Sequence, residues 1–466
     1  MRYSTMIVCI LILCGVPVAS SAGECEQPNV LFLAVDDLND WAGYRGHDQV
    51  LSPNLDRLAD DSVWFSRAYC QYPVCGPSRA SVMTGMYFHQ LKPEQLKIKD
   101  RTVAEKAREL GSKVLHEYFH QHGYKTMAVG KLLHRHISKD GLDLSGGRGG
   151  WDEMKDQDGE RIKINFKSQK TLTDWAPIKK PESAMSDSKA AAWAVERLDE
   201  KHDKPFILMV GFLRPHVPWY VPEKYFRMYD PAKLINPPYF KDDLSDVPDA
   251  ALDTINDGYP RTEWAIEGGH WGDMLQAYLA SITFVDQKVG LVLDALEASP
   301  YRDNTIVVLW SDHGYHMGEK NTFQKHTLWE RSARVQMMIK LPASMRDASI
   351  GPGVGRCDRT VGLIDLYPTL LDLCGLPPNS EVSGRSLKPL LYQPGLAWDH
   401  PVLTYRKDGG KSIRDERFRY IEYGDGSMEL YDHRVDPNEW NNTASDPAYA
   451  GALESMKKLL ERNHKE

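Results

Sequence analysis

The sequence predicts an α/β fold: a large, mainly parallel β-sheet with helices on both faces, followed by a smaller C-terminal α+β domain with an antiparallel sheet. Short, continuous apolar runs alternate with amphipathic helical segments, as expected for a sheet that is covered on both faces. After Gly375 these runs are replaced by short segments separated by tight turns. This change of sequence pattern predicts that the antiparallel sheet lies in the C-terminal part.

Five apolar runs are predicted to be strands of the main sheet: 29–35, 125–129, 206–212, 305–310 and 335–341. Residues that carry charge or bind metals follow four of them directly. These residues are Asp36-Asp37, Gly130-Lys131, Arg214-Pro215-His216 and Ser311-Asp312-His313-Gly314. Because ligands bind beyond the carboxyl ends of parallel strands, we expect these side chains to meet at one site.

Helical periodicity predicts helices that begin at residue 53 and that cover 114–122, 274–296 and 364–374. Glycines at positions 123 and 375 end two of them. The connections 138–185 and 217–272 are long, which in a compact domain indicates a functional role. The predicted C-terminal elements are strands at 402–406, 412–414, 418–422 and 429–431 and a helix at 449–460.

Residues 1–22 are typical of an export signal, with Arg2 before an apolar stretch at 6–18 and small residues at 20–22. The stretch is too short for a membrane span, and no later segment is long and apolar enough. We therefore predict an exported protein, periplasmic or extracellular, or in a lysosome-like compartment of a eukaryote. The predicted main domain covers 23–379 and the smaller C-terminal domain covers 380–466.

The composition is that of a globular protein, with 466 residues, 42% hydrophobic and 26% charged. A formal net charge of −8 argues against a broad nucleic-acid-binding surface. Removal of the signal would take away Cys9 and Cys14 and leave five of the seven cysteines. An odd number in an oxidising compartment predicts one unpaired thiol, and Cys357 with Cys374 is the first pair to check.

The segment Cys75-Gly76-Pro77-Ser78-Arg79, continued by Met83-Thr84-Gly85, predicts a thiol at the start of a helix. Pro77 suits the first helical turn, and the free N–H groups of that turn favour an anion. The planar guanidinium of Arg79 suits sulfate or phosphate oxygens. The alternative is a buried structural thiol before an ordinary helix.

Asp36 and Asp37 are adjacent carboxylates that would repel each other in a dry site unless a proton or a divalent cation joins them. A turn or helix N-cap is the alternative for such a pair. Asp312 and His313 at a second strand end favour the metal interpretation. His313 is a less usual ligand for a hard cation and could instead donate to a carboxylate.

In this order the motifs resemble those of the sulfatase family. The resemblance covers 29 to at least 376, and it includes His134 after Gly130-Lys131 and Lys325 after the 311–314 segment. Within the family, HGYKTMAVGKLLH (122–134), segment 276–296 and the Asp312-His313 pair are most similar to the iduronate-2-sulfatase branch. The two long connections differ, so the sugar specificity stays open.

The resemblance implies an alkaline-phosphatase-like fold and oxidation of Cys75 to formylglycine by a maturation enzyme. It also implies one divalent cation, Ca²⁺ or alternatively Mg²⁺. The implied metal ligands are Asp36, Asp37, residue 75, Asp312 and His313. The implied catalytic residues are Cys75, Arg79, Lys131, His134, His216, Asp312 and Lys325.

In these implied roles Arg79, Lys131 and Lys325 neutralise the sulfate, and Asp312 accepts the nucleophile's proton. His216 protonates the leaving sugar oxygen, and His134 takes a second proton. Taken singly, Lys131, Lys325, His134 and His216 could equally be solvated or structural residues. The structural or solvated interpretation is kept for His47, His89, His120, His270 and His326.

The resemblance therefore implies an exported sulfatase that acts on sulfated mono-, oligo- or polysaccharides. One alternative is a phosphonate or phosphate monoester hydrolase that uses the same aldehyde and cation. The other is a catalytically silent protein that binds sulfated glycans with Cys75 unconverted.

Overall fold

The structure, a computed structural model, describes residues 27–92, 99–149, 163–255, 258–346 and 353–465. Its central element is a nine-stranded sheet of order β11-β2-β10-β8-β1-β6-β3-β4, with the short β9 paired to β2. The strands are β1 (Asn29–Val35), β2 (Val63–Tyr69), β3 (Lys125–Gly130), β4 (Leu144–Gly147), β6 (Phe206–Phe212), β8 (Thr305–Ser311), β9 (Arg334–Val335), β10 (Met337–Lys340) and β11 (Gly355–Gly362). The predicted export signal lies outside the described residues.

The sheet is mainly parallel, as predicted. β8, β1, β6, β3 and β4 run parallel to one another in this order, and β11 runs parallel to β2. The predicted strand 335–341 is present as β9 and β10, and both run antiparallel to their neighbours. The sequence analysis did not identify β2, β4 and β11.

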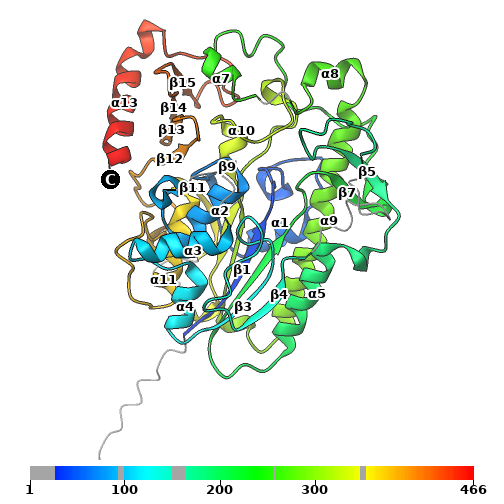
Figure 1. Cartoon of the computed structure of the whole chain (residues 1–466), viewed down its shortest axis with the longest axis vertical. Coiled ribbons are helices and arrows are strands. Elements are labelled where there is room, and N and C mark those ends of the chain that lie inside the picture. Colours follow the sequence, from blue (N-terminus) through cyan, green and yellow to red (C-terminus); the bar gives the residue numbers. More distant parts are fainter. Residues whose placement is uncertain (1–26, 93–98, 150–162, 256–257, 347–352, 466) are drawn as a thin grey trace, which may run out of the picture.

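Both faces of the sheet are buried. In β1, Val30 and Phe32 belong to one hydrophobic core, whereas Leu31 and Leu33 belong to the other. The first core includes residues of α2 (Cys75–Thr84), α3 (Asp100–Glu109), α4 (Leu115–Gln121) and α11 (Leu366–Leu373). The second includes residues of α1 (Pro53–Asp60), α5 (Ser186–Asp199) and α9 (Trp271–Ala298), and Figure 1 shows α5 and α9 on the side of the sheet away from α3 and α4.

The two long connections pair with each other. β5 (Trp175–Ile178) lies at the end of the first and pairs in parallel with β7 (Trp219–Pro222) at the start of the second. Their aromatic residues pack against α9. The short helices of the structure are α6 (Glu223–Phe226), α7 (Asp249–Leu252), α8 (Thr262–Glu267), α10 (Glu330–Ala333) and α12 (Lys388–Tyr392).

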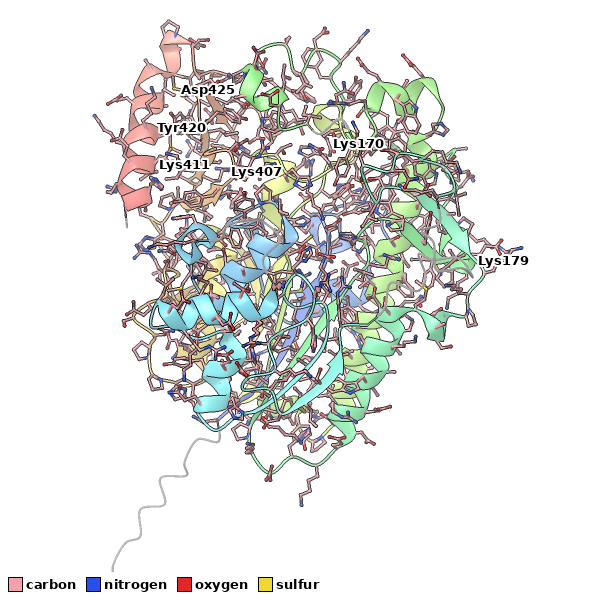
Figure 2. The ribbon with its side chains drawn as sticks, viewed as in Figure 1. Lys170, Lys179, Lys407, Lys411, Tyr420 and Asp425 are labelled. Carbon is pink, nitrogen blue, oxygen red and sulfur yellow. The ribbon has the colours of Figure 1, made fainter. Side chains whose placement is uncertain are left out.

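The C-terminal part forms the predicted antiparallel sheet. Its strands β12 (Val402–Tyr405), β13 (Lys411–Arg414), β14 (Phe418–Glu422) and β15 (Met428–Asp432) follow one another in space, and α13 (Ala450–Lys465) covers one face. Ile421 and Tyr431 on the other face pack against Trp329, the residue before α10. Lys407 and Asp425 lie in the turns of this sheet, and Lys411 begins β13 (Figure 2).

A buried ion-pair network joins this sheet to helix α10. Arg419 on β14 has Nη2 2.6 Å from Glu330 Oε2 on α10 and Nε 2.7 Å from Glu439 Oε1. The Arg419 side chain is fully buried, and the two carboxylates are at most 9% exposed. Such a network makes the removal of one partner costly, because the remaining charges stay buried without compensation.

Arg419→Ala is expected to lower the free energy of unfolding by about 3–5 kcal/mol, because two buried carboxylates lose their counter-ion. Denaturant titration followed by fluorescence measures the change. The control is Arg101→Ala, which removes an exposed ion pair with Glu105 and should cost at most about 0.5 kcal/mol. Equal, small effects of the two substitutions would show that the network does not hold the sheet in place.

The four described cysteines, Cys70, Cys75, Cys357 and Cys374, all have free, buried thiols. The suggested pairing of Cys357 with Cys374 is therefore wrong. Cys357 Sγ lies 3.3 Å from the carbonyl oxygen of Pro394, so it faces a different neighbour. Within the described ranges, no helix has both the length and the apolar character needed to cross a bilayer.

Candidate active site

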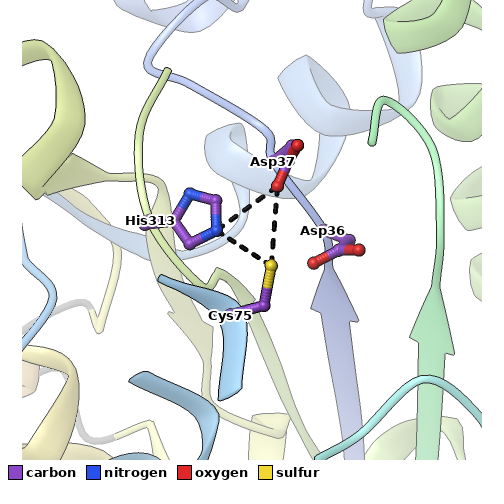
Figure 3. A group of neighbouring side chains, drawn as sticks. All are labelled: Asp36, Asp37, Cys75 and His313. Carbon is purple, nitrogen blue, oxygen red and sulfur yellow. Dashed lines mark hydrogen bonds and ion pairs between the residues drawn. The ribbon is translucent and has the colours of Figure 1, made fainter. Parts of the chain in front are cut away.

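Three distant segments bring four side chains together at the carboxyl edge of the sheet (Figure 3). Asp36 and Asp37 follow β1, Cys75 begins α2 and His313 follows β8. One ligand atom from each lies within 4.8 Å of the others, and all four residues are buried. Two of the four predicted strand ends, those of β1 and β8, therefore meet in this group.

The Cys75 thiol lies at the centre of this group. Its Sγ is 3.2 Å from His313 Nε2, 3.8 Å from Asp37 Oδ1 and 3.0 Å from Lys325 Nζ. Burial, reinforced by the Asp36 carboxylate, raises the pKa of the Cys75 thiol to about 12. An unmodified Cys75 therefore stays protonated near neutral pH and is a weak nucleophile.

His313 presents a lone pair to the group. Its Nδ1 is 2.9 Å from the carbonyl oxygen of Gly314, an acceptor, so Nδ1 carries the proton. Nε2 then faces Cys75 and Asp37, whose Oδ1 is 3.3 Å away. Burial lowers the pKa of His313 and keeps the ring neutral, which is the form that binds a metal ion.

Asp37 is held by its backbone and has one unsatisfied oxygen. Its N–H donates to Asp312 Oδ1 at 3.1 Å, and its carbonyl accepts from the Tyr278 hydroxyl at 2.8 Å. Its Oδ1 is 2.5 Å from Lys325 Nζ, whereas its buried Oδ2 has no hydrogen-bond partner among the described residues. Burial raises the pKa of Asp37, but His216 and Lys325 outweigh burial and lower the pKa to about 2.

Asp36 is paired with two cations. Lys131 Nζ donates to its Oδ2, and Arg79 Nη2 lies 3.4 Å from its Oδ1. Burial opposes ionisation, yet Lys131, His216 and Arg79 together hold the pKa of Asp36 well below its usual range. Lys131 is 3% exposed, so the interpretation of this residue as a solvated loop lysine is wrong.

A close approach of two strands positions Lys131. Gly130 has a φ of +82°, and a Cβ at this position would lie 1.9 Å from the carbonyl oxygen of Gly211 on β6. Only glycine tolerates both conditions. The chain can therefore turn directly after β3, and Lys131 points at Asp36.

Arg79 and Asp312 form a buried pair beside the group of four. Arg79 Nε is 2.8 Å from Asp312 Oδ2, and the guanidinium lies over the Trp310 ring at 5.5 Å. Asp312 Oδ1 is 3.6 Å from His313 Nε2, so Asp312 borders the group of four. Burial raises the pKa of Asp312, although His313 and Arg79 oppose this effect.

The two remaining predicted histidines differ in position. His216 follows β6, is 7% exposed, and has Nδ1 2.6 Å from the carbonyl oxygen of Val217. Burial lowers the pKa of His216 to about 3, although the Asp37 carboxylate raises it. His134 is half-buried in the loop after β3 and does not belong to the group of four.

Sequence reasoning missed several residues that support the site. The Ser78 hydroxyl donates to the carbonyl of Asp312 at 2.5 Å, and the Tyr278 hydroxyl holds the Asp37 carbonyl. The Tyr259 hydroxyl lies 3.4 Å from Nε2 of His326, the residue after Lys325. Ser78 belongs to the cysteine motif, but helical periodicity marks Tyr278 only as a buried residue.

The donor set fits a hard divalent cation. Asp36 and Asp37 supply carboxylates, the ligands that Ca²⁺ and Mg²⁺ prefer, and His313 supplies a neutral imidazole. The strongest indication of a bound cation is Asp37 Oδ2, a buried carboxylate oxygen that has no hydrogen-bond partner among the described residues. A cation at this position would satisfy that oxygen.

Comparisons with known proteins agree with this geometry. Residues 28–376 match the family model described as Sulfatase, and residues 318–466 match the one described as N-sulphoglucosamine sulphohydrolase, C-terminal. A protein of Formosa agariphila named Sulfatase is 40% identical over 95% of this chain and 88% of its own length. Iduronate 2-sulfatase of Mus musculus is 29% identical over 94% of this chain and 95% of its own. The iduronate 2-sulfatases are thus relatives, but the Formosa protein is more similar.

Solved structures share the fold. One, determined in complex with its substrate D-glucosamine-2-N,6-O-disulfate, has a TM-score of 0.73 at 21% identity and covers 94% of this chain and 98% of its own. The phosphonate monoester hydrolase of Agrobacterium radiobacter has a TM-score of 0.74 at 21% identity, with 94% and 95% covered. The architecture is therefore the predicted alkaline-phosphatase-like fold.

Proposed function

Because this chain belongs to the sulfatase family and is a sulfuric ester hydrolase of the sulfated-sugar type, we propose that it cleaves its ester through a formylglycine made from Cys75 and one divalent cation. We further propose that it is exported and that a maturation enzyme converts the cysteine. The gathering of Asp36, Asp37, Cys75 and His313 in one buried group is the observation that carries this proposal.

In the proposed site Asp36, Asp37, His313 and residue 75 hold the cation, Ca²⁺ by preference and Mg²⁺ as the alternative. Asp312 borders them and completes the predicted ligand set. A bound cation would neutralise the carboxylates and lower the pKa of a nearby hydroxyl. Lys131 and Lys325, which now pair with Asp36 and Asp37, could then pair with sulfate oxygens.

Residue 75 supplies the nucleophile. Hydrated formylglycine has one hydroxyl that can attack sulfur and a second whose proton loss can release the sulfate and restore the aldehyde. A thiol lacks the second hydroxyl, and the raised pKa of Cys75 makes it a poor nucleophile. This chemistry is the reason to propose conversion of Cys75.

The surrounding residues supply charge and protons. Arg79, Lys131 and Lys325 stabilise the negative charge on the sulfate oxygens as the bond from sulfur to the sugar oxygen breaks. Asp312 takes the proton of the attacking hydroxyl, and His216 gives a proton to the sugar oxygen that leaves. His134 takes the proton of the second hydroxyl. The pKa of His216, about 3 in the free site, would rise beside an anionic ester.

His216→Gln should lower kcat/KM for a sugar sulfate by about 10²–10³-fold, because an alkoxide leaving group needs a proton. The loss for nitrophenyl sulfate should be at least about tenfold smaller, because its leaving group is a stable phenolate that departs near neutral pH without being protonated. Steady-state rates on both esters measure the ratio, with the exposed His120→Gln as control. Equal losses on the two substrates would rule out His216 as the general acid.

Parallel assays on nitrophenyl sulfate and a nitrophenyl phosphonate test the proposed function directly. The protein used must first be shown to carry the aldehyde at residue 75. We expect the sulfate ester and a sulfated sugar to be cleaved with the higher kcat/KM. A preference for the phosphonate would contradict the proposal, and no turnover of any ester would indicate a silent glycan-binding protein.

A further inference from the structure

A cavity of about 680 Å³ opens next to the active site. It is lined by Val74 and His326, the chain neighbours of Cys75 and Lys325, so it ends one residue away from the proposed nucleophile. Lys170 from the first long connection lines the same cavity. We take this cavity as the entrance through which the ester reaches residue 75.

A second cavity, of about 880 Å³, lies beside the C-terminal sheet. Tyr405, Lys411 and His464 are among the residues that line it. Three residues line both cavities: Tyr72, Arg406 and Lys407. The two cavities are therefore adjacent and share a wall.

Arg406 and Lys407 place the hairpin turn 406–410 in this shared wall, and hydrogen bonds of the preceding strand fix its position. The N–H of Tyr405 donates to the carbonyl of Gln71 at 2.9 Å, and the Thr404 hydroxyl donates to the carbonyl of Cys70 at 2.7 Å. β12 thus runs beside the segment that leads into Cys75. Figure 2 shows Lys407 at this turn, with Lys411 farther along the C-terminal sheet.

The cavities are positively charged although the protein is acidic. Six lysine and arginine side chains and three carboxylates line them, whereas the whole chain has a formal net charge of −8. A concave surface with an excess of one sign of charge concentrates its potential and attracts ligands of the opposite sign. The excess extends into the second cavity through Lys407 and Lys411, although Lys411 Nζ lies 3.3 Å from Glu422 Oε1, the carboxylate that it would exchange for a bound anion.

The shared wall contains donors suited to an anion. The Tyr72 hydroxyl is buried and has no hydrogen-bond partner among the described residues. Burial raises the pKa of Tyr72, so the phenol keeps its proton and can donate. Arg406 Nη1, 3.1 Å from Asp408 Oδ2, adds a guanidinium beside it. A buried donor without a protein partner is available to a water molecule or to a ligand in the adjoining cavity.

Aromatic rings also line the second cavity. The ring centroids of His89 and Tyr405 are 4.5 Å apart, and the Tyr405 hydroxyl lies 3.1 Å from His464 Nδ1. Such rings combine an apolar face with a polar edge. Apolar faces next to lysines suit a sugar ring that carries an anionic group.

We propose that the second cavity is a distal subsite that binds another anionic sugar unit, sulfated or carboxylated, of the same saccharide whose sulfate ester lies at residue 75. The inference rests on the proposed function, and it makes the preferred substrate an oligosaccharide with at least two anionic groups. Lys407 and Lys411 bind the distal anion, and Tyr72 and Arg406 bind the link between the two units.

The test uses the full chain with Cys75→Ala, so that binding is measured without turnover. A fluorescent tetrasaccharide with a sulfate on every unit is titrated by anisotropy, and a carboxylate-only oligosaccharide separates the two anion types. In this Cys75→Ala background, the double substitution Lys407→Gln with Lys411→Gln should raise the Kd for at least one of these probes about tenfold. Lys179→Gln, an exposed lysine far from both cavities in Figure 2, should leave Kd unchanged.

A second readout uses the aldehyde-bearing enzyme with the same substitutions. The double substitution should reduce kcat/KM for the sulfated tetrasaccharide at least about tenfold more than for nitrophenyl sulfate, mainly through KM. The subsite is wrong if both probes bind the double variant as tightly as they bind the Lys179→Gln variant. It is also wrong if the probes bind neither variant. Both conclusions hold even when the enzyme cleaves nitrophenyl sulfate. If the Kd difference appears without cleavage of any ester, the subsite stands and the proposed function fails.

Discussion

Cys75→Ala is expected to abolish turnover, with kcat reduced by at least about 10⁴-fold, as when a nucleophile is removed from other covalent catalysts. The small alanine replaces a side chain that is 5% exposed and contacts Lys325, His313 and Asp37. Folding should be retained, because α2 keeps its backbone pattern and alanine favours helices. Initial rates on nitrophenyl sulfate and a thermal melt measure both quantities.

The matched control is Cys357→Ala, which removes another buried thiol far along the chain, on β11. It should retain the activity of the parent protein. Persistent turnover by Cys75→Ala, at rates near those of Cys357→Ala, would show that residue 75 is not the nucleophile. A collapse of both variants in the melt would point to packing rather than chemistry.

Asp37→Asn is expected to remove most of the bound divalent metal and to lower kcat/KM by at least about 100-fold. The substitution takes away the negative charge that pairs with Lys325, and the amide replaces the unsatisfied Oδ2. An amide is a weaker ligand than a carboxylate for a hard cation. Metal content by elemental analysis after dialysis gives a readout that does not depend on activity.

Asp48→Asn is the control for this substitution, because Asp48 is an exposed carboxylate on a loop after the same strand. Its metal content and rate should match those of the parent. Unchanged metal content in Asp37→Asn would contradict the assigned ligand. If the variant keeps its metal but loses its activity, Asp37 is not a required ligand and acts only by positioning Lys325.

The fold was predictable where burial leaves a strong pattern. Central strands such as β1 and β6 are continuous apolar runs, and each is fully buried. β11, at the edge of the sheet, carries Arg356, Asp358 and Arg359, so its sequence lacks that pattern. Strand direction was not predictable either, because β10 is mostly apolar like the central parallel strands and yet runs antiparallel to both of its neighbours, β2 and β8.

The candidate site was predictable because its residues follow strand ends or belong to one compact motif. Asp36, Asp37 and His313 are read directly from the chain after β1 and β8. The supporting contacts depend on tertiary packing: Tyr278 reaches Asp37 from a helix that starts far along the chain. The same holds for Tyr72, which lines the two cavities together with Arg406 and Lys407 from a distant part of the chain.

The mass of the peptide that contains residue 75, measured in catalytically active protein, tests the central claim most directly. We expect the mass of an aldehyde in place of a thiol, trapping by hydroxylamine, and a specific activity that rises in proportion to the converted fraction. Fully active protein in which every molecule retains the Cys75 thiol would contradict the account.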